Sequence, residues 1–182
     1  MSENLEKTGL NGQVVDDQNG ASANERLLFS AKQDSEEVFL ELESQGGYDI
    51  NFKDGLGNTA LHYAVIYLSP TVLELILEHE GADVDLINNQ GLTPLHCAIQ
   101  IKEPKPRLLI TKSLLEAGAD TRIKNKHNQR PIDMIPTAVS NEIPEDRELR
   151  KALKEAEAEQ EIGEDEIAKD EFDDDDVASE DE

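Results

Sequence analysis

One octapeptide occurs twice in the chain, and its copies begin 34 residues apart. They read Gly57-Asn-Thr-Ala-Leu-His-Tyr-Ala64 and Gly91-Leu-Thr-Pro-Leu-His-Cys-Ala98. A fixed period of this length is typical of stacked supersecondary units, because one unit cannot bury its apolar face without its neighbours. Residues common to the copies should therefore be architectural, and functional residues should lie where the copies differ.

Weaker copies flank the two clear ones at nearly the same spacing. They are the segments Asn24–Ala31 and Asn128–Ile135. A second motif recurs in the same phase and begins at Gly47, Gly81 and Gly118. Because two independent motifs share one phase, the sequence predicts about four consecutive units.

The shared threonine and histidine indicate the type of repeat. Thr93-Pro-Leu-His96 followed by Ala98 matches the T-P-L-H-x-A motif of ankyrin repeats, and the first copy differs only at the proline. Over about residues 24–158 the chain resembles an ankyrin-repeat protein. The resemblance implies an all-α ankyrin-repeat solenoid, with two central repeats plus degenerate N- and C-terminal capping repeats.

The same resemblance implies structural roles for Thr59, His62, Thr93 and His96. In ankyrin repeats the threonine and histidine of this motif hydrogen-bond each other and the neighbouring turn. Metal binding is the alternative for the histidines, but no further ligands stand at the spacing that a metal site needs. We therefore predict no metal site.

Local signals agree with helical units. Pro94 and Pro131 stand where a first helical turn would begin, and there a missing N–H costs nothing. Extra residues in the third unit coincide with Glu103–Arg107, which we predict to be a lengthened loop between two helices. From Pro144 onward we predict a charged helix with one docked face, as a terminal repeat requires.

Charge is distributed unevenly along the 182 residues, whose formal net charge is −24. Residues 155–182 contain 16 acidic residues and one lysine, which is too polar a composition for a core. We predict a disordered N-terminal segment at 1–23, an ankyrin-repeat domain at 24–158 and a disordered acidic tail at 159–182. Ser179 in that tail is either a site for acid-directed kinases or an ordinary tail serine.

Composition also disfavours several classes of protein. The sequence has no apolar run long enough for a membrane span and no start typical of a secretory signal. Cys97 is the only cysteine, so we expect a reducing compartment, namely the cytoplasm with the nucleus as a second location. The acidic balance argues against direct nucleic-acid binding. We expect the chain alone to be a monomer.

Signals for catalysis are weak. The segment Gly55-Leu-Gly-Asn-Thr-Ala60 fits a dinucleotide pattern. A tight turn between repeats, with positive φ at Gly55 and Gly57, explains the same residues. No recognisable base accompanies Cys97 as a nucleophile. The sequence therefore predicts a protein that is not an enzyme and has no catalytic residues and no cofactor.

Positions that differ between repeats carry the remaining functional signal. In ankyrin proteins, turn tips and first-helix residues outside the repeated pattern line a concave surface. Tyr63 and Tyr67 lie one helical turn apart, so they are either interface anchors or a cover for the neighbouring repeat. The predicted protein-binding residues are Phe52, Lys53, Tyr63, Ile66, Tyr67, Ile87, Asn88, Asn89, Gln100 and Ile101.

Basic residues gather in the last turn, where they would bind an acidic partner or the chain's own tail. This basic cluster consists of Arg122, Lys124, Lys126, His127 and Arg130.

These observations predict a non-catalytic module that binds a protein partner. One hypothesis is an escort or chaperone for a basic client, a role that small acidic-tailed ankyrin proteins can have. The alternative is a regulatory subunit or inhibitor of an enzyme complex. A third, disfavoured hypothesis is a nucleotide-binding enzyme, which would need Gly55 and Gly57 to bind the nucleotide.

Overall fold

The computed structural model describes residues 21–135 and 143–167, and within them the regular secondary structure is helical. Seven α-helices and one 3₁₀ helix occur there in four consecutive pairs. The pairs are α1 (Ala23–Gln33) with α2 (Glu36–Gln45), α3 (Ala60–Ile66) with α4 (Pro70–Glu78), α5 (Pro94–Ile99) with α6 (Pro104–Glu116), and η1 (Pro131–Met134) with α7 (Pro144–Ile167).

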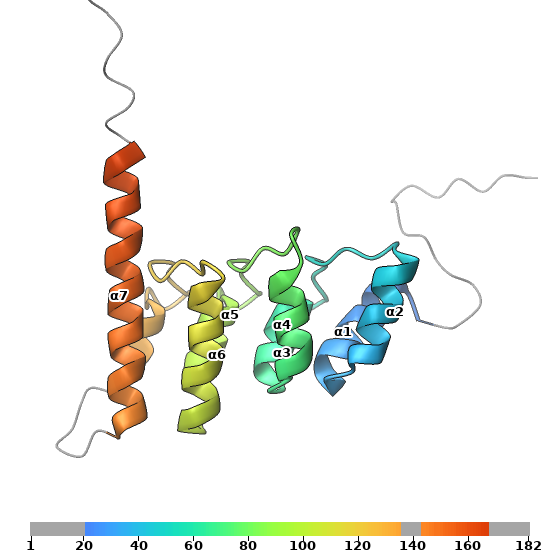
Figure 1. Ribbon diagram of the computed structural model, residues 1–182, viewed down its shortest axis with the longest axis horizontal. Coiled ribbons are helices and arrows are strands. Elements are labelled where there is room, and N and C mark those ends of the chain that lie inside the picture. The colour runs from blue at the N-terminus through green and yellow to red at the C-terminus, as the bar shows by residue number, and fades with distance from the viewer. Residues whose placement is uncertain (1–20, 136–142, 168–182) are drawn as a thin grey trace, which may run out of the picture.

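The pairs stack in chain order, and the connections between them lie on one side of the stack (Figure 1). Helices α1, α3, α5 and η1 contact one another in sequence and form one row of the stack. The pairs α3/α4 and α5/α6 therefore have neighbours on both sides, whereas the first and last pairs have one neighbour each. The predicted all-α solenoid with two central units and two caps is confirmed.

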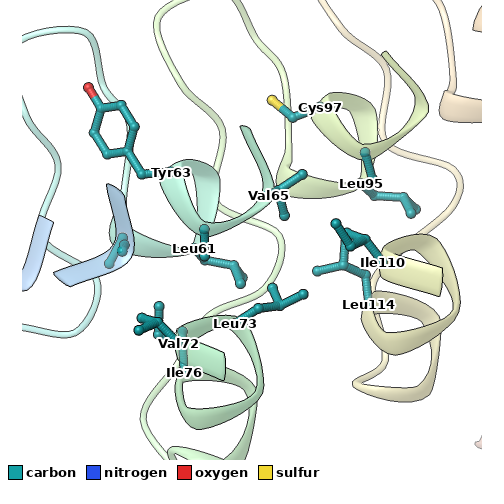
Figure 2. Close-up of a cluster of buried hydrophobic side chains, with 14 of the residues drawn as sticks. Leu61, Tyr63, Val65, Val72, Leu73, Ile76, Leu95, Cys97, Ile110 and Leu114 are labelled. Atoms are coloured by element: carbon teal, nitrogen blue, oxygen red, sulfur yellow. The ribbon is translucent and has the colours of Figure 1, made fainter. Parts of the chain in front are cut away.

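The core is built from equivalent residues of the two central units. Leu61 and Leu95 occupy the same position in the octapeptide, and both are buried. Each lies in a layer of apolar side chains from the following helix, Val72, Leu73 and Ile76 in α4 and Ile110 and Leu114 in α6 (Figure 2). Helix α5 has only six residues, too few to be stable alone, so this packing maintains it.

The extra residues of the third unit lengthen a helix rather than a loop. Helix α6 begins at Pro104 and has 13 residues, whereas α4 has nine. The loop predicted at Glu103–Arg107 is therefore wrong from Pro104 onward. Pro104 and Pro106 both lie in the first turn of α6, where backbone N–H groups have no acceptor within the helix.

Helix α7 docks one face on the stack, as expected for a terminal unit. Leu149 and Leu153 on that face are buried, and Asp146 accepts a hydrogen bond from Arg107 of α6. The helix continues to Ile167 and so includes the first nine residues of the tail predicted to begin at residue 159. Glutamate, glutamine and alanine favour the helix in this stretch. The predicted disorder of 1–20 and 168–182 concerns residues outside the described part of the chain.

One side-chain device holds three successive turns. Asp54, Asn88 and Asn125 each accept hydrogen bonds through Oδ1 from the backbone N–H groups two and four residues later, at 2.8–3.1 Å. A short side chain that binds its own backbone in this way fixes a turn locally. The turns therefore project from the stack in one repeated conformation.

Neighbouring turns approach each other so closely that two of them require glycine. Gly57 and Gly91 have φ of 75° and 76°. A Cβ atom on Gly57 would lie 2.7 Å from the backbone nitrogen of Asn89. The third equivalent residue is Asn128, which also has positive φ. Positive φ at Gly55, which the sequence also predicted, is not observed.

A ladder of hydrogen bonds joins the bases of these turns. The N–H of Asp83 donates to Oδ1 of Asn51 at 2.9 Å, and the N–H of Asp120 donates to Oδ1 of Asp85 at 2.9 Å. At the end of the stack, Gln160 of α7 accepts from the N–H and the hydroxyl of Thr121 and donates to the carbonyl of Ala119. Helix α7 is thus bonded to the base of the last turn.

Candidate functional site

Two adjoining hollows lie between the turn tips and the ends of the first helices. The first has a volume of about 380 Å³ and is lined by Leu56, Asn58, Ile66, Asn88, Asn89, Gln90, Leu92, Cys97, Gln100 and Ile101. The second has a volume of about 540 Å³ and is lined by Asn89, Gln90, Leu92, Gln100, Asn125, Lys126, His127, Gln129 and Met134. Because four residues line both, the hollows form one continuous depression, called here the turn groove.

Exposed apolar side chains gather at the first hollow. Leu56 and Ile66 line it and are 64% and 47% exposed, and Tyr67 next to Ile66 is 54% exposed. Ile87, at the base of the next turn, is 48% exposed. Contiguous exposed apolar surface in a soluble domain is typical of a binding site.

Amide side chains supply hydrogen-bonding capacity at the junction of the hollows. Asn89 donates through Nδ2 to the carbonyl of Gly55 at 3.0 Å, so part of its capacity is used internally. Gln90 and Gln100 make no side-chain hydrogen bond within residues 21–135 and 143–167, and both are exposed. A glutamine amide offers donors and an acceptor, which suits pairing with the backbone of a bound peptide.

The turn groove brings together five of the predicted binding residues, namely Ile66, Asn88, Asn89, Gln100 and Ile101. Phe52 instead packs partly buried against the core. Lys53 is exposed, and its Nζ donates to the carbonyl of Ile87 at 2.9 Å, so this lysine links two turns outside the hollows.

Tyr63 is not an exposed anchor. Its ring is buried beneath the Lys32 ammonium, which lies 4.0 Å from the ring centroid, and its hydroxyl donates to Asp54. Burial raises the pKa of Asp54, but this bond and those from the backbone N–H groups of Asn58 and Leu56 outweigh it and lower the pKa. Tyr63 therefore covers the neighbouring unit, which was the alternative interpretation. Tyr67 alone keeps the exposure of an anchor.

Asn88 has an internal role that the sequence analysis did not assign. It is buried, it holds its own turn through Oδ1, and its Nδ2 donates to Oδ1 of Asn58 at 3.0 Å. Asn88 therefore has a structural role as well as a place in the lining of the groove, and its role in partner binding stays a prediction. The periodic occurrence of Asp54, Asn88 and Asn125 was the signal that could have shown this.

Leu56 and Gln90 line the groove but were not predicted. Together with His127 they occupy the same turn position in three successive units, and the three residue types differ. The rule that functional residues lie where the copies differ would have selected them.

The two motif histidines join each first helix to the next turn. Nδ1 of His62 lies 2.9 Å from the Thr59 hydroxyl, and Nε2 lies 3.0 Å from the carbonyl oxygen of Leu92. His96 repeats the arrangement with Thr93 and with the carbonyl of Gln129 at 3.1 Å. Because a carbonyl can only accept, Nε2 must carry the proton in both rings. These are the hydrogen bonds that the resemblance implied.

Burial lowers the pKa of His62 and of His96, and the bond to the carbonyl opposes this shift in each. Both rings are therefore neutral at pH 7. Burial also raises the pKa of the Cys97 thiol to about 12, which makes it a poor nucleophile. Among the described residues, no three or more His, Cys, Asp or Glu side chains are grouped so that they could hold a metal ion.

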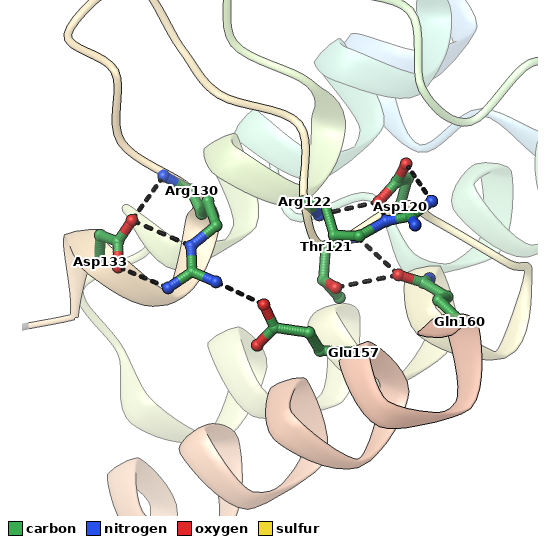
Figure 3. A network of polar contacts seen from close by, with 7 residues as sticks. All are labelled: Asp120, Thr121, Arg122, Arg130, Asp133, Glu157 and Gln160. Atoms are coloured by element: carbon green, nitrogen blue, oxygen red, sulfur yellow. Dashed lines mark hydrogen bonds and ion pairs between the residues drawn. The ribbon is translucent and has the colours of Figure 1, made fainter. Parts of the chain in front are cut away.

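The basic cluster of the last turn is partly engaged within the molecule. Figure 3 shows Arg122 bonded to Asp120, and Arg130 bonded to Asp133 and to Glu157 of α7. Lys126 donates to the carbonyl of Asn89 at 2.6 Å. These contacts attach the last turn to α7 and to the preceding turn. Lys124, Lys126 and His127 remain exposed at the tip.

Comparison with known proteins agrees with this geometry. The family model of ankyrin repeats in three copies matches residues 27–129. The chain belongs to the ankyrin-repeat family. The matched range runs from Leu27 within α1 to the last turn, and it leaves the capping helix α7 outside. Ankyrin repeats form protein–protein interaction modules, so this ankyrin-repeat chain is a module of that kind, from a family that is typically non-catalytic.

The relatives differ in the share of their own length that aligns with this chain. Ankyrin repeat-containing protein YGL242C of Saccharomyces cerevisiae is 37% identical over 128 residues, which are 64% of this chain and 71% of that protein. Human NF-kappa-B inhibitor delta is 32% identical over 113 residues, 60% of this chain and 36% of that protein. The BTB/POZ domain and ankyrin repeat-containing protein NPR3 of Oryza sativa is 47% identical over 60 residues, 33% of this chain and 10% of its own.

Within the described residues, no helix is both long enough and apolar enough to cross a bilayer.

Proposed function

We propose that this chain binds a segment of a partner protein in the turn groove. The observation that carries the proposal is the coincidence of two exposed apolar side chains, Leu56 and Ile66, with the exposed amides of Gln90 and Gln100 around one depression. Apolar side chains of the segment would fill the hollows, and the glutamines would pair with its backbone. The proposed working form is a monomer in the cytoplasm, with the nucleus as a second compartment.

Affinity capture with matched variants tests the groove. The full chain, an Ile66→Glu, Gln100→Glu double variant and a Leu109→Glu control are compared, with mass spectrometry as the readout. Leu109 is 64% exposed on α6 and does not line the groove. A partner held by the wild type and the control but lost from the groove variant supports the proposal. Equal capture by all three overturns it.

We further propose that the partner is a basic protein for which this chain acts as an escort. The support is the concentration of acidic residues between positions 155 and 182, which would attract a basic partner and raise the encounter rate. Purified partner is mixed with the chain, and its light scattering is followed in low salt. Suppressed aggregation that is lost at 1 M salt supports an escort, since the Debye length there is about 3 Å. Unchanged aggregation overturns the escort hypothesis.

A regulator or inhibitor is the second candidate. Its support is the similarity to a protein named as an inhibitor, NF-kappa-B inhibitor delta. If the captured partner is an enzyme, its rate is measured with and without the chain. A change of rate at stoichiometric amounts favours the regulator, whereas an unchanged rate with improved solubility favours the escort.

A further inference from the structure

The tips of the turns are basic, although the chain as a whole is strongly acidic. Lys53 is exposed at the first turn and Lys124, Lys126 and His127 at the last, whereas the exposed acidic residues Asp49 and Asp83 lie at the bases of the turns. In the turn segments 52–58, 86–92 and 123–129 the acidic residue is Asp54, and it is bonded to Tyr63 and to its own turn. The groove therefore favours an anionic ligand at the end formed by the last turn.

The second hollow adjoins the exposed basic residues of the last turn, Lys124, Lys126 and His127, which are called here the rim. A ligand that binds to both needs an apolar side chain for the hollow and negative charge for the rim. Met134 and Leu92 line the hollow together with amide side chains, which suits one large apolar side chain. Lys126 and His127 at its edge suit carboxylates beside that side chain. A short acidic segment with a single aromatic residue has both features.

The chain contains such a segment beyond the described residues. Positions 170–176 read Asp-Glu-Phe-Asp-Asp-Asp-Asp, with Phe172 as the aromatic residue. Its charge is complementary to the rim, and its aromatic side chain has a size that the second hollow accommodates.

The path of α7 brings this segment within reach of the rim. Glu157 of α7 contacts Arg130, and Gln160 contacts Thr121. Thr121 and Arg130 stand at the two ends of the last turn. The helix then runs on toward the side of the stack that carries the turns (Figure 1). From Gln160 to Ile167 it advances about 10 Å at 1.5 Å per residue.

The remaining distance is short. The tip of the last turn is four or five residues from Thr121, about 15 Å in extended chain. The nine residues from 168 to 176 span up to about 30 Å. The acidic run can therefore arrive at Lys124, Lys126 and His127 without any change in the stack.

We propose that residues 170–176 of this chain bind in the second hollow of the turn groove, with Phe172 inside it and Asp173–Asp176 against Lys124, Lys126 and His127. The tail and the partner segment then compete for one groove. This consequence rests on the proposed function, whereas the intramolecular contact does not.

A single fluorophore tests the contact in the full chain. The chain has no tryptophan, so Phe172→Trp gives one reporter at the position of interest. Emission and acrylamide quenching are compared with those of a synthetic peptide of residues 168–182 that carries the same substitution. The proposal expects emission at shorter wavelength and a lower quenching constant in the chain than in the peptide, with both differences lost at 1 M salt. Peptide-like values in the chain overturn it.

Paired charge reversals locate the contact. Lys124→Glu with Lys126→Glu should return the reporter to the peptide values. The exposed basic face of α7 also lines a hollow, of about 450 Å³, and Arg147→Glu with Lys151→Glu should leave the reporter unchanged. If only the α7 pair releases the reporter, the tail lies on α7 and the proposal is wrong. Circular dichroism melts establish that each variant remains folded.

Dilution separates contact within one chain from contact between two. An emission maximum that is independent of chain concentration supports the proposal, whereas a shift that disappears on dilution means binding by a second copy and overturns it. These measurements need no partner, so their failure leaves capture through the groove untouched. Loss of capture in the groove variants, conversely, has no bearing on the reporter.

Discussion

The central turns and the last turn use the same internal chemistry but meet different neighbours. Asn88 and Asn125 hold their turns through the same pair of hydrogen bonds, and His62 and His96 bind those turns in the same way. Gly57 and Gly91, however, face a following turn at close range, whereas Asn128 in the last turn has no equivalent neighbour in the described chain.

This difference separates two requirements that repeat sequences combine. The Asp or Asn side chain that builds a turn recurs in all three turns, including the last. Residues that allow the next unit to approach recur only where a next unit exists. At the end of the stack α7 takes the place of a further unit, and its Gln160 bonds to the base of the last turn.

Core truncation should show the largest difference between centre and end. Leu95→Ala in α5 should cost about 2–5 kcal/mol of the free energy of unfolding. Leu153→Ala in α7 removes an equally buried side chain, but its effect should concentrate on the last unit. Hydrogen exchange should show lost protection in α3 and α5 for Leu95→Ala, and in α7 with α3 unaffected for Leu153→Ala. Equal loss throughout for both variants would mean that the stack has no separable end.

The motif histidines should contribute equally at the two kinds of turn. Replacing His62 or His96 with alanine removes the ring's bonds to the carbonyl of Leu92 or Gln129 and to the hydroxyl of Thr59 or Thr93, at a cost of about 1–3 kcal/mol. Urea denaturation of both variants measures this cost. A much smaller effect for His96→Ala would show that α7, rather than the histidine, holds the last turn. Added zinc should not alter the melting temperature of the wild type.

The same histidines should make stability depend on pH. Because burial lowers the pKa of both rings below the ordinary value of 6.5, the unfolded chain binds protons more readily than the folded chain. Their contribution is fully present above pH 6.5 and is lost as the pH falls from there through the lowered values. Stability measured between pH 7.5 and 5.0 should fall less steeply in a His62→Gln, His96→Gln double variant. Parallel curves would rule out this source of the pH dependence.

Substitutions at the left-handed position of each turn should affect stability differently in a central turn and in the last turn. Gly57→Ala places an L-residue at φ 75° and a Cβ atom against Asn89. The backbone conformation alone should cost about 1–2 kcal/mol, and the close contact adds to this. Asn128→Gly should cost nothing, because the position is already left-handed and faces no turn. Thermal melts of the two variants give the comparison, and a destabilised Asn128→Gly would contradict it.

The smallest effect is expected at the contact that closes the stack. Gln160→Ala removes the bonds to Ala119 and Thr121, each of which should contribute about 0.5–1.5 kcal/mol. The matched control is Glu159→Ala, an exposed neighbour on the same helix. Hydrogen exchange at the amide of Thr121 should accelerate in the first variant only. Unchanged exchange would mean that α7 is held by its leucines alone.

Most of the architecture followed from period and residue type. The octapeptide located α3 and α5, and Thr93 with Pro94 marked where α5 starts, because capping and the missing proline N–H are local effects. The start of α6 was misjudged because two prolines usually interrupt a helix, and only the position of the helix start showed that both fall in its first turn. The extent of α7 depended on the bonds of Gln160 with Thr121 and Ala119, a tertiary contact with no local signal.

The groove could be predicted only in part. Ile66, Gln100 and Ile101 were found because first-helix positions that vary between units face outward. Tyr63 was placed on the same surface, but its burial depends on Lys32 of the preceding unit and on Asp54. Such contacts bring together residues from different units, and spacing within one unit does not determine them.

Closure by Gln160 also has a consequence for the integrity of the chain. A molecule cleaved before α7 would expose the carbonyl of Ala119, the N–H of Thr121 and the apolar side of α6 to solvent. The opposite end of the stack presents α1 and α2, which follow no other unit among the described residues. Head-to-tail joining of these two unlike ends would not close on itself, so growth would continue into filaments or precipitate. Loss of α7 by proteolysis should therefore convert a finite stack into an open-ended polymer.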